Sequence, residues 1–179
     1  MSEISLFFTK YSLYNDPEVN RVAAPFRLML KRPLPVLGLA LAFCLAISAR
    51  ASERWETLEA IHWVENPHNS TRVGSHGELG PYQFRIATWR MYTKKPFTLA
   101  VDRQESDRIA IMHYEWIKSN FERNGIDPTA YNIAMAWNSG LDAVLNGHIP
   151  ASTHEYAQQV SNIAAHLRQQ QLAVNDRTQ

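Results

Sequence analysis

The chain is poor in cysteine, because Cys44 is the only one among its 179 residues. Cys44 lies in an apolar segment near the amino terminus, so the rest of the chain cannot form a disulfide and depends on its core and on helix packing. A disulfide-rich secreted scaffold and a cysteine-based zinc site are therefore excluded. Phe43 stands before Cys44 where a lipidation signal needs a small residue, which argues against a lipid anchor.

Patterns for binding metal or nucleic acid are also missing. The seven histidines form no His-Glu-x-x-His motif, although His62 and Glu65 are one helical turn apart. Residues 52–179 carry 12 Lys and Arg against 14 Asp and Glu, a net charge of −2, with no polybasic run. We therefore expect no metal, no other cofactor and no nucleic-acid partner.

The main hydrophobic run is too short for a comfortable membrane span. It follows two basic residues and leads to the small-x-small triplet Ala49-Arg50-Ala51, a pattern typical of a secretory signal. Residues 1–51 are interpreted as an amino-terminal extension plus signal peptide, with Met29 as the expected true start and cleavage after Ala51. The protein is then exported, periplasmic or extracellular. The alternative is an uncleaved signal-anchor in the inner membrane, facing the periplasm.

Residues 52–168 are long enough for one domain with its own core, and their periodicity is mostly helical. The predicted helices cover residues 55–65, 87–91, 106–123, 128–139 and 152–167. Asp127 is expected to cap the fourth helix with Pro128 at its first position, and Ser152 is expected to open a capping box. Residues 169–179 form a polar tail that we expect to fray.

Between the first and third predicted helices, the segment RVGSHGELGPYQF is dense in glycine. The spacing of Gly74, Gly77 and Gly80 favours tight turns or a close approach of the backbone to a ligand. The segment can hold a small hairpin, although taken alone it is more typical of a connecting loop.

Glu65 ends the first predicted helix, on the apolar stripe that contains Leu58 and Ile61. Desolvation on such a stripe penalises the charged carboxylate, so the pKa should rise, and a neutral acid near neutral pH can protonate a glycosidic oxygen. A negative charge near a helix carboxyl end also opposes the macrodipole, which makes a purely structural Glu a poor choice there. The alternatives are a partly exposed helix end or an ion pair with Arg72 or Arg85.

Several motifs follow one another in order. They are the helix-terminal Glu65, Gly77-x-x-Gly80-x-x-Gln83 with Thr88 after it, the segment AMAWNSG and the segment THEYAQQV. Together they span most of residues 52–167, and the ordered set resembles the lytic transglycosylases of the lysozyme-like superfamily. The resemblance implies a mainly α, lysozyme-like fold of the α+β type, with a small Gly-rich loop or β-hairpin element. It also implies peptidoglycan glycan strands as the substrate.

The chain departs from the family pattern at several positions. Where the family usually has Ser, a small residue, Pro and Tyr, this chain has Asn66, Glu78, Ile86 and Trp137. The family's Asn near the start of the third helix has no counterpart around Asp107 and Arg108. The departures concern subfamily and substrate contacts and leave Glu65 in place.

A second carboxylate is the usual requirement for glycoside hydrolysis, and Glu78 and Asp142 are the visible candidates. The resemblance implies another route, in which Glu65 acts first as acid and then as base. In that route the substrate's own acetamido group stabilises the oxocarbenium ion, and the C6 hydroxyl of the N-acetylmuramic acid (MurNAc) attacks in place of water. The product is a 1,6-anhydro sugar.

The substrate-binding candidates are Tyr82, Gln83, Trp137, Asn138 and Tyr156. Gln83 follows the Gly-rich turn and can hydrogen-bond to acetamido or hydroxyl groups. Tyr156 lies on an inner helical stripe, and its hydroxyl needs a partner, which can be Glu65 or the substrate. Asn138 alone would be read as a helix-end residue, and its place in the site comes from the resemblance. Tyr82 and Trp137 are candidates for stacking on sugar rings.

Three functions from different classes remain open. The leading one is a peptidoglycan lytic transglycosylase that cleaves the β-1,4 bond between MurNAc and N-acetylglucosamine (GlcNAc). The second is a hydrolytic lysozyme or chitinase, and the third is a non-catalytic glycan-binding protein. Product analysis separates the first two, and any cleavage excludes the third. We expect a monomer that binds peptidoglycan strands, with a cell-envelope complex as a candidate partner.

Overall fold

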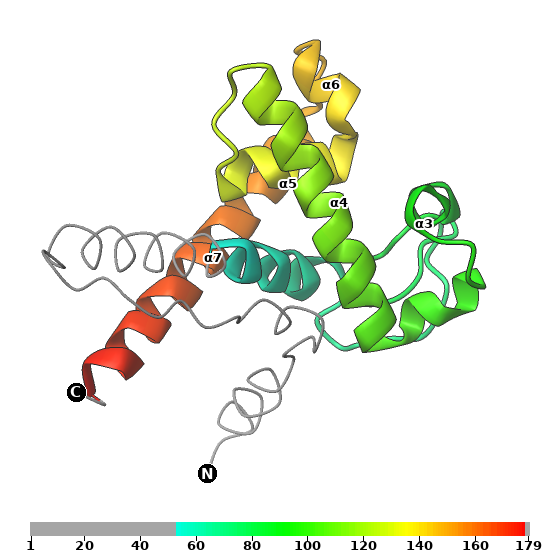
Figure 1. The fold of residues 1–179 in the computed structure, drawn as a ribbon, viewed down its shortest axis with the longest axis horizontal. Helices are drawn as coiled ribbons and strands as arrows, with labels where there is room; N and C mark the ends of the chain where they lie inside the picture. Colours follow the sequence, from blue (N-terminus) through cyan, green and yellow to red (C-terminus); the bar gives the residue numbers. More distant parts are fainter. Residues whose placement is uncertain (1–52, 178–179) are drawn as a thin grey trace, which may run out of the picture. The chain divides into compact units, whose positions relative to one another are not determined.

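The computed structural model describes residues 53–177. The predicted signal, start and cleavage site in residues 1–51 lie outside the described residues, as do residues 178–179. A helix over residues 53–65 comes first. It is followed by α3 (Ile86–Tyr92), the 3-10 helix η1 (Phe97–Val101), α4 (Arg103–Arg123), α5 (Ala130–Ser139), α6 (Leu141–Leu145) and α7 (Ala151–Arg177) (Figure 1). The expected mainly helical class is confirmed.

The helix over residues 53–65 is the most enclosed element, since residues 56–62 are all buried. Charged side chains tie it to α4 and α7, the two long helices beside it in Figure 1. Arg54 donates to Glu115 on α4 at 2.7 Å, and Arg168 on α7 donates to the fully buried Glu56 at 2.8 Å. This double attachment fixes the amino-terminal part of the helix against α4 and α7, and Glu65 lies at the opposite end.

The remaining helices pack around the same core. α5 packs mainly against α7 and also contacts α4, while α3 and η1 pack against α4. Trp89 of α3 and Phe121 of α4 are the largest fully buried side chains. One hydrophobic core therefore joins the first helix, the Gly-rich segment, α3, α4, α5 and α7.

The Gly-rich segment forms a compact loop with one isolated antiparallel bridge, between Leu79 and Phe84, and no strand is assigned within residues 53–177. Gly80 has φ +83°, and a Cβ there would lie 1.7 Å from the carbonyl oxygen of Ala100. Only glycine fits this approach of the loop to η1. The expected β element is thus reduced to a single bridge.

Most predicted helices are confirmed, with small shifts at their ends. α3 extends the prediction for residues 87–91 by one residue on each side. α4 begins at Arg103, three residues before the predicted start, because the Asp102 side chain accepts a hydrogen bond from the backbone N–H of Glu105.

Three predicted helix ends were wrong, at the start of α5 and at both ends of α7. α5 begins at Ala130 and not at Pro128, because Thr129 rather than Asp127 caps it, accepting from the N–H of Asn132 at 3.2 Å. Ser152 does not open α7, which already begins at Ala151. The same helix continues to Arg177, so most of the expected polar tail is helical, in keeping with its Gln, Leu, Ala and Arg content.

Within residues 53–177, no helix combines the length and the apolar character that a membrane crossing requires.

Candidate active site

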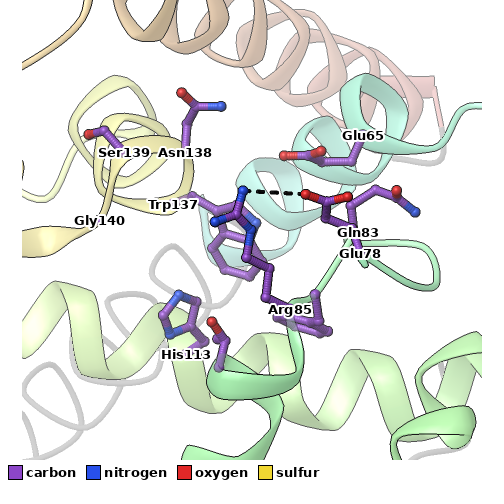
Figure 2. Close-up of a pocket in the computed structure, with 11 residues that line it drawn as sticks. Glu65, Glu78, Gln83, Arg85, His113, Trp137, Asn138, Ser139 and Gly140 are labelled. Atoms are coloured by element: carbon purple, nitrogen blue, oxygen red, sulfur yellow. Dashed lines mark hydrogen bonds and ion pairs between the residues drawn. The ribbon is translucent and has the colours of Figure 1, made fainter. Parts of the chain in front are cut away.

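An open cleft of about 330 Å³ lies between the end of the first helix, the Gly-rich loop, α4 and α5. Figure 2 shows its side chains, with Glu65 on one side and Asn138 on the other. The lining residues are Glu65, Glu78, Gln83, Phe84, Arg85, Thr88, His113, Trp137, Asn138, Ser139 and Gly140. The cleft thus gathers four of the residues proposed from sequence, although they come from three separate segments.

Glu65 is the last residue of its helix, and its carboxylate is tied to α7. The hydroxyl of Tyr156 donates to Oε1 of Glu65 at 2.7 Å. Burial raises the pKa of Glu65; the hydrogen bond from Tyr156 opposes this rise, and the negative charge of Glu78 adds to it. The net effect keeps a proton on Glu65 to higher pH than on an exposed carboxyl, as a general acid requires.

Tyr156 acts as a hydrogen-bond donor in this pair. Burial and then the charge of Glu65 raise the pKa of Tyr156 well above its usual range, so the phenol stays protonated. The Tyr156 hydroxyl contacts Glu65 and does not line the cleft. Tyr156 therefore orients the Glu65 carboxyl group rather than contacting a ligand directly.

Gln83 lies in the loop with φ +45°, a left-handed conformation that is uncommon for a residue with a side chain. Its Nε2 donates to the carbonyl oxygen of Gly80 at 2.8 Å, and that carbonyl also accepts from the Asn66 side chain at 3.2 Å. Asn66 is buried, and its amide bonds to the backbone of Ser70 in both directions. The carbonyl of Gly80 therefore links the loop to the residue that follows Glu65.

Glu78 lies in the same cleft, and its side chain is only 16% exposed. Its Oε2 accepts from the backbone N–H of His76 at 2.9 Å, and its Oε1 lies 3.4 Å from the guanidinium of Arg85. Arg85 was a candidate partner of Glu65 on sequence grounds, but the structure pairs it with Glu78. Glu78 thus enters the site as a second carboxylate, while the alternative, Asp142, is exposed on α6 and does not line the cleft.

The opposite wall is built by α5 and α4. The buried Thr153 donates to Oδ1 of Asn138 at 2.8 Å, which sets the orientation of that amide. The rings of Trp137 and His113 pack edge to face, with their centroids 4.8 Å apart. Burial lowers the pKa of His113 to about 4, so this wall is uncharged near neutral pH. An uncharged wall with an aromatic ring and an amide suits a polar, neutral ligand such as a sugar.

Tyr82 does not share the cleft. It is buried, packs against Phe84 and Trp137, and donates from its hydroxyl to Asp107 at 2.6 Å. The structure therefore places Tyr82 in the hydrophobic core, and its ring does not line the cleft.

Sequence reasoning missed the polar network that anchors this loop. Arg103 donates to Glu59 at 2.8 Å and to Asp107 at 2.7 Å, so the first helix, α4 and Tyr82 are joined through one guanidinium. Burial alone would raise the pKa of Glu59, but its contacts with His62 and Arg103 lower it to about 2. The i,i+4 spacing of Arg103 and Asp107 was the available signal. His113, which lines the cleft from α4, is another residue of the site that sequence reasoning missed.

Among residues 53–177, no group of three or more potential metal-ligating side chains comes together. No protein-family model matches the chain, and no curated protein or solved structure matches it significantly.

Proposed function

We propose that this protein is a peptidoglycan lytic transglycosylase with a lysozyme-like fold, and that it cleaves the MurNAc-GlcNAc β-1,4 bond. The observation that carries the proposal is the Glu65 carboxyl group, raised in pKa and hydrogen-bonded by Tyr156, at the wall of an open polar cleft. The ordered motifs of the sequence support the choice of glycan as substrate.

In the proposed reaction, protonated Glu65 gives its proton to the glycosidic oxygen as the bond from that oxygen to C1 of MurNAc breaks. The acetamido group of the substrate stabilises the positive charge that develops at C1. The C6 hydroxyl of the same sugar then attacks C1, and the Glu65 carboxylate takes its proton. The proton balance closes on Glu65, no water is consumed, and the product carries a 1,6-anhydro ring.

Three other residues are assigned to the substrate. Gln83 and Asn138 hydrogen-bond to acetamido or hydroxyl groups from the two walls of the cleft, and Trp137 contacts a sugar face. Asn138 can do so because Thr153 occupies its Oδ1 and leaves its amide nitrogen available for a ligand. No charged group is needed on the α5 wall, which agrees with the neutral substituents of a glycan backbone.

A hydrolytic glycosidase is the second candidate, and a specific observation favours it. Glu78 lines the same cleft as Glu65, so a water activated by Glu78 could replace the C6 hydroxyl as nucleophile. The hydrogen bond from His76 and the nearby Arg85 hold Glu78 as a charged carboxylate, the state that a base requires.

Mass spectrometry of the fragments released from purified peptidoglycan tests both candidates. Transglycosylation yields anhydro ends that are one water lighter than the reducing ends produced by hydrolysis. Anhydro ends from the wild type, and no fragments from Glu65→Gln, are the expected result. Reducing ends would establish the hydrolase instead, and binding without any cleavage would leave a glycan-binding protein.

The proposed substrate lies outside the cytoplasmic membrane, so the proposal includes export through the predicted signal. Amino-terminal sequencing of the protein from an extracytoplasmic fraction should find a chain that begins near Ser52. A membrane-retained chain that begins at Met1 would support the signal-anchor alternative.

A further inference from the structure

Glu78 is held as a fixed negative charge in the cleft. The backbone N–H of His76 donates to its Oε2 at 2.9 Å, and the Arg85 guanidinium lies 3.4 Å from its Oε1. Gly74 closes over it, since a Cβ on Gly74 would lie 2.7 Å from Oε2 of Glu78. Gly74 lies this close because its backbone N–H donates to the carbonyl oxygen of Glu78 at 2.8 Å. The loop therefore leaves the Glu78 carboxylate little room to move.

Glu78 and Glu65 line the same cleft, and Figure 2 shows both carboxyl groups pointing into it, with the Arg85 guanidinium joined to Glu78. Among the other residues that line the cleft, Arg85 is the one that is charged near neutral pH, and it pairs with Glu78. α7 contributes the neutral hydroxyl of Tyr156, and α4 contributes His113, which burial keeps uncharged near neutral pH. α5 contributes an indole, an amide and a hydroxyl to the lining, none of them charged. Glu78 is thus the anion that acts on Glu65 from within the cleft.

We propose that Glu78 is a positioning residue for the catalytic proton: its fixed negative charge, in the same cleft, adds to the effect of burial in keeping that proton on Glu65. The role rests on the proposed function, in which Glu65 must begin the reaction protonated. It assigns Glu78 no contact with substrate and no bond-making step. It also accounts for a charged residue where related cleft loops, by the resemblance above, carry a small one.

The pKa values of Glu65 and Glu78 are shifted in opposite directions, as this role requires. Partial burial alone would raise the pKa of Glu78, but the backbone hydrogen bonds, His76 and Arg85 hold it below its usual range. Burial raises the pKa of Glu65, Tyr156 opposes the rise and Glu78 adds to it. Between the two pKa values, Glu78 is charged while Glu65 still holds its proton, which is the arrangement of an acid beside a fixed anion.

The test is a carbon-13 NMR titration of the Glu65 side-chain carboxyl, in the wild type and in Glu78→Gln. The pKa of Glu65 should fall in the variant, because the neighbouring negative charge is gone. Glu115→Gln is the matched control, since it removes one carboxylate that pairs with Arg54 and does not line the cleft. An equal shift in both variants, or no shift in Glu78→Gln, would overturn the proposal.

Glu78→Ala guards against a rearranged loop in the Gln variant. It removes the charge without supplying an amide, so a fall in the Glu65 pKa common to both variants comes from charge rather than shape. A fall seen in one variant alone would contradict the electrostatic role.

The pH dependence of glycan cleavage gives a second readout. In Glu78→Gln the alkaline limb of the kcat profile should move to lower pH, in step with the fall in the Glu65 pKa. A large loss of rate at every pH with an unchanged Glu65 pKa would instead make Glu78 the base of a hydrolase. The NMR titration needs no substrate, so absence of any cleavage would refute the proposed function without deciding the coupling between the two carboxyls.

Discussion

The hydroxyl of Tyr156 donates a 2.7 Å hydrogen bond to Oε1 of Glu65, across 91 positions of the chain. The contact brings the first described helix and α7 together at the cleft. It opposes the rise in the Glu65 pKa that burial and Glu78 produce. The pKa of Glu65 is therefore set by burial and by two neighbouring side chains that act in opposite directions, and each of these side chains can be replaced separately.

Tyr156→Phe should raise the pKa of Glu65 further. The phenol donates to the carboxylate and so favours the charged form, while Phe keeps the ring and removes only the donor. A titration of the Glu65 carboxyl and the alkaline limb of the activity profile should both move to higher pH, opposite to the shift expected for Glu78→Gln. A downward shift in Tyr156→Phe would contradict the assignment of the hydroxyl as the donor.

Glu65→Gln should abolish cleavage without unfolding the protein. Gln has nearly the same size and its oxygen can still accept from Tyr156, but it cannot exchange a proton. Loss of a positioned general acid or base typically lowers the rate by about 10²- to 10⁴-fold. Rates on purified peptidoglycan, with circular dichroism as the control of folding, provide the measurement. Activity within a few-fold of wild type would make Glu65 a structural residue.

The same variant has a characteristic stability profile. Because folding raises the pKa of Glu65, the wild type keeps its full stability below the unfolded value of about 4.3 and loses stability as the pH rises through the folded value. The Gln variant has no such loss. The difference in Tm, variant minus wild type, should therefore grow with pH across that window and then level off. A difference that does not change with pH would contradict the raised pKa.

Gly80→Ala should destabilise the fold severely. The added Cβ would lie 1.7 Å from the carbonyl oxygen of Ala100, so the loop or η1 must move. Gly77 is the matched control, since its φ is +84° and a Cβ there meets nothing within 4 Å. Gly77→Ala should lose only the roughly 1–2 kcal/mol of a left-handed alanine. Urea denaturation of both variants would disprove the steric argument if their losses were equal.

Arg103→Met should reduce stability at neutral pH and less so in acid. Burial alone would raise the pKa of Glu59, but His62 and Arg103 together lower it to about 2. The group therefore contributes stability above its unfolded pKa, and this contribution is lost as the pH falls toward 2. A lowering of the Glu59 pKa by this amount corresponds to about 3 kcal/mol of stability at neutral pH, and Arg103 supplies a part of it. In urea titrations, the difference in the free energy of unfolding between variant and wild type should narrow between pH 4 and pH 2. A difference that stays constant would contradict the lowered pKa of Glu59.

Local patterns in the sequence predicted the helices well, because periodicity and capping act over a few residues. The stripe that ends at Glu65, the short α3 and the body of α4 all lie where the sequence placed them. Errors occurred where two local signals competed. Thr129 and Asp127 are both residue types that cap helices. Thr129 caps α5 because its hydroxyl accepts a hydrogen bond from the N–H of Asn132.

The composition and motif order of the chain determined by themselves that it is helical and that Glu65 is the candidate acid. Only the tertiary structure decided what surrounds that acid. The hydroxyl of Tyr156 donates to Glu65, the hydroxyl of Tyr82 donates to Asp107, and Glu78 pairs with Arg85 in the cleft. The first two of these contacts join segments far apart in the chain, and the third depends on how the loop closes. Their partners and their pKa values therefore depend on packing and burial, which no local pattern of residues contains.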